Sequence, residues 1–243
     1  MYSRVLRHIS ASDLRESLTL KFRDKLNTVF WKDNSLRGEV REALMKFGKA
    51  FAEYVDLPEA AIKDILMLGG NAGYNYTKHS DIDVHLVVDP KYVPDCDPEL
   101  IDDYYSDKKM LWLLTHDVKV YGAEVEPYVE QPGKKRRKSQ GVYSVLKKKW
   151  IQEPKQISED PDESEIAKKA NNYKRKIETL IRGDNASGMK AVLKKLNAIR
   201  NESLDKYGEY GFDNMVYKEL RNSGHIDKVR KALVELKSKS LSL

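Results

Sequence analysis

The sequence contains one cysteine and lacks any long apolar run. Cys96 alone cannot form an internal disulfide or a cysteine-rich metal site. The longest apolar stretches, such as Ile65–Leu68, are too short to cross a bilayer, and no apolar run typical of a secretory signal follows Met1. These absences exclude disulfide scaffolds and cysteine-ligated metal sites, and they predict a cytoplasmic protein without a membrane partner.

Histidine is scarce as well, and charge of neither sign dominates. The five histidines show no spacing typical of a metal site. There are 44 basic and 38 acidic residues, a formal net charge of +6, which permits a polyanionic partner without requiring one. With 40% hydrophobic residues over 243 positions, the chain can form one large domain or two small ones.

Both ends of the chain carry helical patterns. Apolar residues recur every four positions from Leu14 to Phe30 and again from Leu36 to Tyr54, which predicts two N-terminal helices. The acidic stretch 158–163 is typical of a helix start because acids there complement the helix dipole. The pattern beyond it predicts a C-terminal helical region with later helices near 193–199, 213–221 and 225–237.

The middle of the chain predicts a small sheet. The stretches 64–68 and 81–88 are typical of strands, and 118–120 with 123–129 predicts a hairpin. A helix from 97 to 115 is expected to bury Leu100, Tyr104, Leu111 and Leu114. The outline is an α+β fold with a core at 1–133 that includes the two N-terminal helices, a basic connecting segment at 134–157, and a helical region at 158–243.

The predicted strand at 81–88 carries two carboxylates, Asp81 and Asp83. Because strand side chains alternate, both face the same way, with His85 in line, while the apolar residues between them face the core. Two adjacent carboxylates repel each other unless cations lie between them, and Mg²⁺ prefers oxygen ligands. Two such ions can stabilise the attacking and leaving oxygens of a phosphoryl transfer. For this pair alone, a solvated polar face is the alternative.

A glycine turn precedes the aspartates. Gly69 and Gly70 end the strand at 64–68 and would let backbone N–H groups approach a phosphate closely. A short helix starting near Asn71 would add its positive end, and Lys78 could reach the same phosphate. Alone, the glycines are more typical of an ordinary strand-ending turn. Followed by paired carboxylates, they indicate a phosphate-binding turn.

A third carboxylate comes from the strand at 123–129. Glu124 and Glu126 share one face of this strand, and either could meet the aspartates if the two strands are neighbours. Such a carboxylate would hold a catalytic metal and help to deprotonate an attacking hydroxyl. Pro127 is typical of an edge strand, which leaves a solvated face as the alternative.

A basic run follows this strand and gives the strongest indication of a partner. It consists of Lys134, Lys135, Arg136, Arg137 and Lys138. Clustered basic side chains beside an active site attract phosphates through counterion release. We therefore interpret the run as a nucleic-acid contact, with a solvated loop as the alternative.

The order of these motifs is that of a known superfamily. Leu68-Gly-Gly followed by Asp81-Ile-Asp-Val resembles the signature of the DNA polymerase β-like nucleotidyltransferases, and Val125-Glu126 resembles their third acidic strand. Many members have serine at the second glycine position, so the hydroxyl is missing at Gly70. Asn71 could supply that polar contact, or the backbone alone could suffice.

A narrower resemblance covers flanking stretches. The segments Gly70–Tyr76, Gly141–Ser144 and Trp150-Ile151 look like those of small nucleotidyltransferases of tailed phages. The cytoplasm would then be that of the host. The superfamily resemblance itself covers about residues 61–131.

The resemblance implies a mixed sheet flanked by helices, a nucleoside triphosphate substrate and two Mg²⁺ ions, for which Mn²⁺ could substitute. By position, Asp81 and Asp83 would bind the metals, Glu126 would complete the site, and Gly69 and Gly70 would approach the β- and γ-phosphates.

The implied reaction moves a nucleoside monophosphate to a hydroxyl and releases pyrophosphate. The basic run favours an RNA 3′ end, such as that of tRNA, as the acceptor. Nucleotidylation of a small molecule, or synthesis of a nucleotide second messenger, is the first alternative. An inactive nucleotide- or nucleic-acid-binding protein of the same fold is the second.

Overall fold

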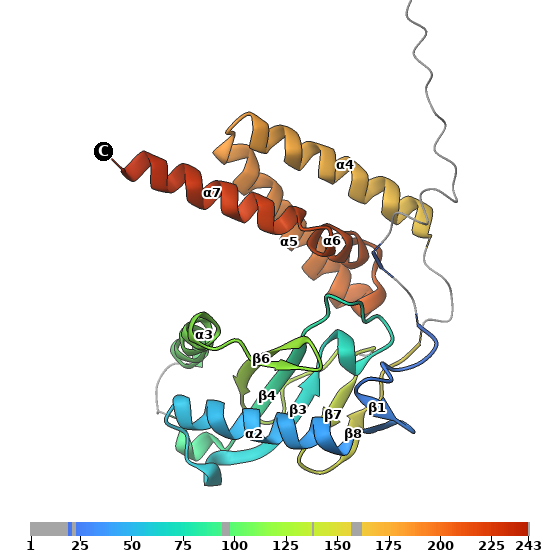
Figure 1. Ribbon diagram of the computed structural model, residues 1–243, viewed down its shortest axis with the longest axis vertical. Helices are drawn as coiled ribbons and strands as arrows, with labels where there is room; N and C mark the ends of the chain where they lie inside the picture. The colour runs from blue at the N-terminus through green and yellow to red at the C-terminus, as the bar shows by residue number, and fades with distance from the viewer. Residues whose placement is uncertain (1–18, 21–22, 94–97, 138, 157–161, 243) are drawn as a thin grey trace, which may run out of the picture. The chain divides into compact units, whose positions relative to one another are not determined.

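The computed structural model describes residues 19–20, 23–93, 98–137, 139–156 and 162–242. These residues fall into two units (Figure 1). The first, within Phe22–Gln156, carries a sheet with helices, and the second, within Ile157–Leu243 together with Thr19 and Leu20, is helical. The chain therefore has the α+β composition that the sequence predicts.

A mixed sheet forms the centre of the first unit, with six strands in the described residues. Its strand order is β5-β6-β4-β3-β7-β8. The pair β4 and β6 is parallel, while the other neighbouring pairs are antiparallel. The strands are β3 (Ile62–Leu68), β4 (Ile82–Val88), β5 (Lys119–Val120), β6 (Ala123–Glu130), β7 (Val142–Ser144) and β8 (Lys149–Gln152).

Two helices accompany the sheet, α2 (Gly38–Tyr54) and α3 (Pro98–Thr115). The helix α3 lies in the crossover that the parallel pair β4 and β6 requires. The helix α2 lies over one face of the sheet (Figure 1), and its apolar stripe is buried with apolar residues of β3 and β4. Each such large side chain contributes about 1.5–3 kcal/mol of hydrophobic free energy on burial. The packed residues include Val40, Leu44, Phe47 and Phe51 of α2 with Ile65, Met67, Val84 and Leu86 of the sheet.

The strand β4 separates the core from the polar face of the sheet. Ile82, Val84 and Leu86 are fully buried, whereas Asp83 and His85, which alternate with them, are only partly buried. The period of two therefore fixes which way the carboxylates point, because the apolar residues are committed to the core. A shift of one residue would bury the charged face.

The helix α3 was predicted with the wrong buried face. Its described extent matches the prediction, although Asp97 lies outside the described residues. The core contains the rings of Tyr105 and Trp112, and the Trp112 ring lies 5.4 Å from that of Phe51. Apolar residues occur on two faces of this helix, and the face with the larger aromatic area is buried. The four residues expected in the core are exposed: Leu100, Tyr104, Leu111 and Leu114.

The first predicted helix, from Leu14 to Phe30, is not present in the part of this range that the structure describes. Residues 14–18 and 21–22 lie outside the described part, and residues 23–30 form bends and turns. The carbonyl of Asn27 accepts hydrogen bonds from the N–H groups of Phe30 and Trp31, which closes a turn. The chain then enters a short hairpin of β1 (Trp31–Lys32) and β2 (Ser35–Leu36). Leu26 and Phe30 are buried as expected, but from a turn and not from a helix.

The strands β7 and β8 were not predicted. They lie within a basic stretch and are only three and four residues long, so period-two alternation cannot be recognised in them. Their position is fixed by tertiary contacts: Ser144 Oγ donates to the buried Asp64 carboxylate at 2.6 Å, and the Trp150 ring stacks on Trp31 at 4.6 Å. The sheet therefore extends beyond β3 on the side away from β4.

The helices of the second unit lie near the positions that the sequence pattern predicts. Its interior includes a carboxylate, because Glu219 is fully buried and accepts hydrogen bonds from Lys174 Nζ at 2.7 Å and from the N–H of Thr19 at 2.8 Å. Among the described helices of the whole chain, none is long and apolar enough to span a bilayer. The elements are α4 (Glu163–Arg182), α5 (Ala186–Tyr207), α6 (Phe212–Asn222) and α7 (His225–Leu241).

Candidate metal centre

Three carboxylates meet on the polar face of the sheet. Asp83 on β4 lies directly opposite Glu126 on the parallel strand β6, and Asp81 precedes β4 by one residue. One oxygen from each of these residues lies within 4.8 Å of the others, and all three side chains are half-exposed. Within the described residues, this is the cluster whose geometry could hold a metal ion. Hard oxygen donors in this number suit Mg²⁺ or Mn²⁺.

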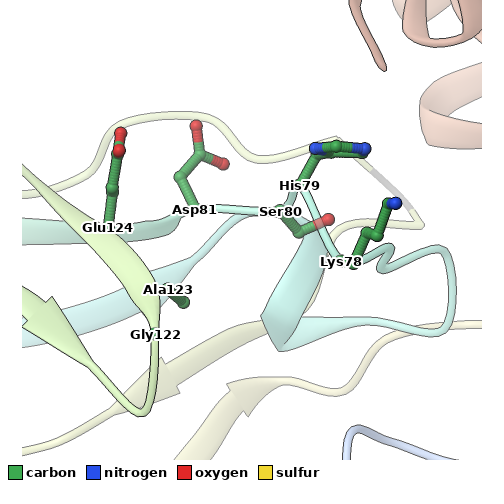
Figure 2. Close-up of a pocket in the computed structure, with 7 residues that line it drawn as sticks. All are labelled: Lys78, His79, Ser80, Asp81, Gly122, Ala123 and Glu124. Carbon is green, nitrogen blue, oxygen red and sulfur yellow. The ribbon is translucent and has the colours of Figure 1, made fainter. Parts of the chain in front are cut away.

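The register distinguishes the two glutamates. Glu126 belongs to the carboxylate cluster, whereas the exposed Glu124 lies two residues earlier on β6. Figure 2 shows the carboxylates of Glu124 and Asp81 pointing in the same direction at the rim of a cavity. The geometry therefore favours Glu126 as the third ligand and leaves Glu124 as a lining residue of the cavity.

The glycine turn lies directly against the cluster. Gly69 has φ of +82°, and a Cβ atom there would overlap the Asp83 carboxylate. A Cβ atom on Gly70 would come within 2.9 Å of Ser80 Oγ. Glycine is therefore needed at both positions because the turn packs closely against Asp83 and Ser80. A backbone approach to phosphate, which the sequence suggests, would use the same lack of side chains.

If the cluster catalyses the nucleotide transfer that the sequence predicts, we expect Gly69→Ala to lower its rate by about 100-fold, because displacing a reacting group by about 1 Å has an effect of this size. Gly133→Ala is the matched control, since Gly133 also has a positive φ, +84°, but no atom of the described residues lies within 4 Å of the place that its Cβ would take. Steady-state turnover and thermal unfolding of both variants provide the comparison. Equal losses of turnover would mean that strain, and not the contact with Asp83, explains the effect.

Asn71 holds the start of β4 from inside the protein. Its side chain is buried, and its Nδ2 donates to the carbonyls of Ser80 at 2.8 Å and Asp81 at 3.0 Å. Its Oδ1 accepts from Asn27 Nδ2 at 3.0 Å. The sequence suggested Asn71 as a phosphate contact, but these bonds place its amide on the backbone of the aspartate segment. The expected short helix is a three-residue 3₁₀ turn, Gly70–Ala72, too short to provide a helix dipole.

A lysine and a tyrosine contact the third carboxylate, and the sequence analysis identified neither. Lys109 Nζ on α3 lies 2.6 Å from Glu126 Oε2, and the Tyr128 hydroxyl donates to the same oxygen at 3.0 Å. Burial, followed by the nearby Asp83 and Glu126 carboxylates, raises the pKa of Tyr128, so its hydroxyl remains a donor. Tyr128 could have been identified because it shares a strand face with Glu126. Lys109 lies on another element, and no local pattern indicates it.

A second polar group supports the ring of Tyr128. The His85 imidazole stacks on that ring at 4.4 Å, and its Nδ1 lies 2.8 Å from Glu130 Oε2. Burial lowers the pKa of His85 below its usual value, although Glu130 opposes this effect. The tautomer that fits this contact has its proton on Nδ1, which then donates to the carboxylate. Burial alone would raise the pKa of Glu130, but hydrogen bonds from His85 and Arg136 bring it below its usual value.

The basic run is only partly available to an external phosphate. Arg136 forms an ion pair with the buried Glu130, with one guanidinium nitrogen 3.1 Å from Oε2. Arg137 is half-buried, and its carbonyl accepts from Gln152 Nε2 at 2.6 Å. Lys134 and Lys135 are exposed, while Lys138 lies outside the described residues.

A small polar cavity of about 280 Å³ adjoins Asp81 on the side of β6. Lys78 and His79 line one end of it, and the turn between β5 and β6 lines the other (Figure 2). Gly69 follows β3, which pairs with β4 on the side opposite to β6. Lys78 lines the same cavity as Asp81 and as Ser80, against which Gly70 packs, and its contact with a phosphate stays a prediction.

Comparison with known proteins gives little beyond this geometry. No family model matches the chain, and no curated protein matches it. One solved structure that resembles it is a STING-associated CdnE c-di-GMP synthase from Capnocytophaga granulosa, with 11% sequence identity over 85% of this chain and 84% of that one. The TM-score of 0.22 is too low for this likeness to carry an argument.

Proposed function

We propose that the protein is a metal-dependent nucleotidyltransferase, which moves a nucleoside monophosphate from a nucleoside triphosphate to a hydroxyl and releases pyrophosphate. The observation that carries this proposal is the cluster of Asp81, Asp83 and Glu126 beside the turn at Gly69. Carboxylates from two adjacent strands next to a side-chain-free turn can hold divalent ions where a triphosphate can approach. A solvated polar face would not need a glycine packed against Asp83.

The residues present fit Mg²⁺ or Mn²⁺. Their donors are carboxylate oxygens, and an ammonium group, that of Lys109, already lies against Glu126 as a counter-charge. When bound, the ions would supply electrostatic stabilisation of charge on the phosphoryl oxygens and lower the pKa of the attacking hydroxyl.

The chain's own residues then have separate tasks. Gly69 and Gly70 let the turn pack directly against Asp83 and Ser80, and Asn71 holds the aspartate segment in place. Lys78 at the cavity rim can offset phosphate charge. Catalysis of this kind depends on positioning and electrostatics and needs no covalent work by the protein.

The cavity favours a small hydroxyl-bearing acceptor, such as a second nucleotide, over an RNA end. The cavity adjoins Asp81, so a hydroxyl held in it would lie beside the carboxylate cluster. Its volume of about 280 Å³ is near the lower end of ligand pockets and suits one nucleoside-sized group. Arg136, moreover, is committed to Glu130, which weakens the case for RNA.

An RNA 3′ end is the second candidate acceptor, and the exposed Lys134 and Lys135 favour it. The two candidates make different predictions about salt. For a small acceptor, we expect labelled product from nucleotide alone, with less than about a threefold change in rate between 50 and 200 mM salt. An RNA acceptor that contacts several phosphates would lose affinity by orders of magnitude over this range.

The measurement incubates the protein with Mg²⁺ and each α-labelled triphosphate, with and without total small RNA, at both salt concentrations. Label that appears only on RNA and falls steeply with salt would refute the small acceptor. An inactive binding protein of the same fold would bind nucleotide and give no label under any condition.

A further inference from the structure

Lys109 occupies an unusual position for a lysine. Its side chain is only 16% exposed, and its ammonium lies 2.6 Å from Glu126 Oε2. Lysine side chains are mostly exposed, and those that are fully buried are almost always paired. The pair is formed across two elements, since Lys109 lies on α3 and Glu126 on β6. The fold thus brings a positive charge to one of the three clustered carboxylates.

The aromatic ring of Tyr128 forms the other wall of this position. Lys109 Nζ lies 3.5 Å from the centroid of the ring, which is a close cation–π contact. The hydroxyl of the same tyrosine donates to Glu126 Oε2 at 3.0 Å. The His85 imidazole also stacks on this ring and is itself held by Glu130. The ammonium is therefore held by groups that are fixed in turn by their neighbours.

A divalent ion and this ammonium cannot share one carboxylate oxygen easily. Magnesium binds oxygen at about 2.0–2.1 Å and demands nearly octahedral geometry. Glu126 Oε2 already accepts from both Lys109 and Tyr128. An ion at this oxygen would also stand next to a like charge in a half-buried environment, where charges interact strongly.

We propose that Lys109 is a placeholder cation, which positions Glu126 in the metal-free protein and competes with the metal ion for the same carboxylate. The inference rests on the metal centre of the proposed function, and it identifies Lys109 as a group that controls the affinity of this centre for the metal ion. Lys109 acts here through Glu126 and is a positioning residue. On entry of the ion, the ammonium leaves the oxygen, and the Tyr128 ring remains as its apolar support.

The test measures Mn²⁺ binding in the absence of nucleotide, by the loss of the free-ion electron paramagnetic resonance signal. Lys109→Met removes the charge and keeps an unbranched side chain that is one atom shorter, and we expect it to tighten Mn²⁺ binding by about tenfold because a like charge beside the ion is lost. Lys109→Arg keeps the charge and is expected to stay within about threefold of the unmodified protein. Lys109→Gln serves as a second neutral variant if the methionine variant unfolds.

The contrary results are equally definite. Unchanged or weaker binding in the neutral variants would overturn the proposal, because a purely structural lysine would loosen Glu126 when removed. Absence of measurable Mn²⁺ binding in every form would overturn it too. Adding Asp83→Asn to Lys109→Met should abolish the tight Mn²⁺ binding. This loss would show that the ion binds at the carboxylate cluster.

This readout is independent of catalysis. Suppose that Lys109→Met binds Mn²⁺ tightly and that the unmodified protein transfers no nucleotide. The placeholder assignment would then stand, and the proposed function would be wrong. Nucleotide transfer with unchanged Mn²⁺ affinity in the neutral variants would do the reverse.

Discussion

Replacing Asp83 by asparagine is expected to lower nucleotide transfer by about 1,000-fold or more, because it removes a charged ligand from the middle of the cluster. Asp83 lies opposite Glu126 in the parallel register, and its carboxylate lies against Gly69. Asparagine has nearly the same volume, so the packing of the glycine turn should survive. The loss should therefore appear in turnover and in Mn²⁺ binding, with little change in thermal unfolding.

A matched control uses an aspartate outside the site. Asp103 is exposed on α3, and we expect Asp103→Asn to keep full activity. If Asp83→Asn retained more than about one tenth of the activity of the unmodified protein, the assignment of a metal centre to this cluster would be wrong.

The second large effect is expected at Glu126, and it separates the two neighbouring glutamates. We expect Glu126→Gln to lower turnover by about 100- to 1,000-fold, because it removes a carboxylate with an oxygen within 4.8 Å of an oxygen of each aspartate. Glu124→Gln should change turnover by less than about fivefold, since Glu124 lines only the cavity rim. Turnover of the two variants under identical Mg²⁺ concentrations provides the measurement.

The opposite ranking would have a specific meaning. If Glu124→Gln were the inactive variant and Glu126→Gln the active one, β6 would present its other acidic residue to the metals, a shift of two residues against β4. Equal and small losses would mean that β6 supplies no ligand.

Local patterns were enough to predict the strand that carries the aspartates. In β4, strict alternation commits Ile82, Val84 and Leu86 to the core, so the direction of Asp83 follows from the sequence alone. The parallel register of β4 and β6 does not follow from it, because it depends on the crossover through α3. This is why the sequence left Glu124 and Glu126 as alternatives.

Tertiary packing decided what local patterns could not. The stripe of α3 that ends in Leu114 has regular helical spacing, yet the face with Trp112 is buried because its ring packs among those of α2. The same packing sets the rotation of α3 and so directs Lys109 to Glu126. A lysine placed by the rotation of a distant helix leaves no signal in its own neighbourhood of the sequence.

The basic run illustrates the same limit for charge. Composition indicated a patch for nucleic acid, but Arg136 folds onto the buried Glu130, where it compensates a charge that would otherwise be costly to bury. Counting basic residues cannot separate such internal partners from surface charge.

The most direct test of the central claim follows the phosphates of ATP separately. The protein is incubated with Mg²⁺ and ATP labelled at either the α- or the γ-phosphate, beside an EDTA control. Nucleotidyl transfer predicts that the α-label enters a larger product while the γ-label appears in pyrophosphate, and that both depend on Mg²⁺. Transfer of the γ-label to an acceptor, or its release as inorganic phosphate with the α-label left in ADP, would contradict the account.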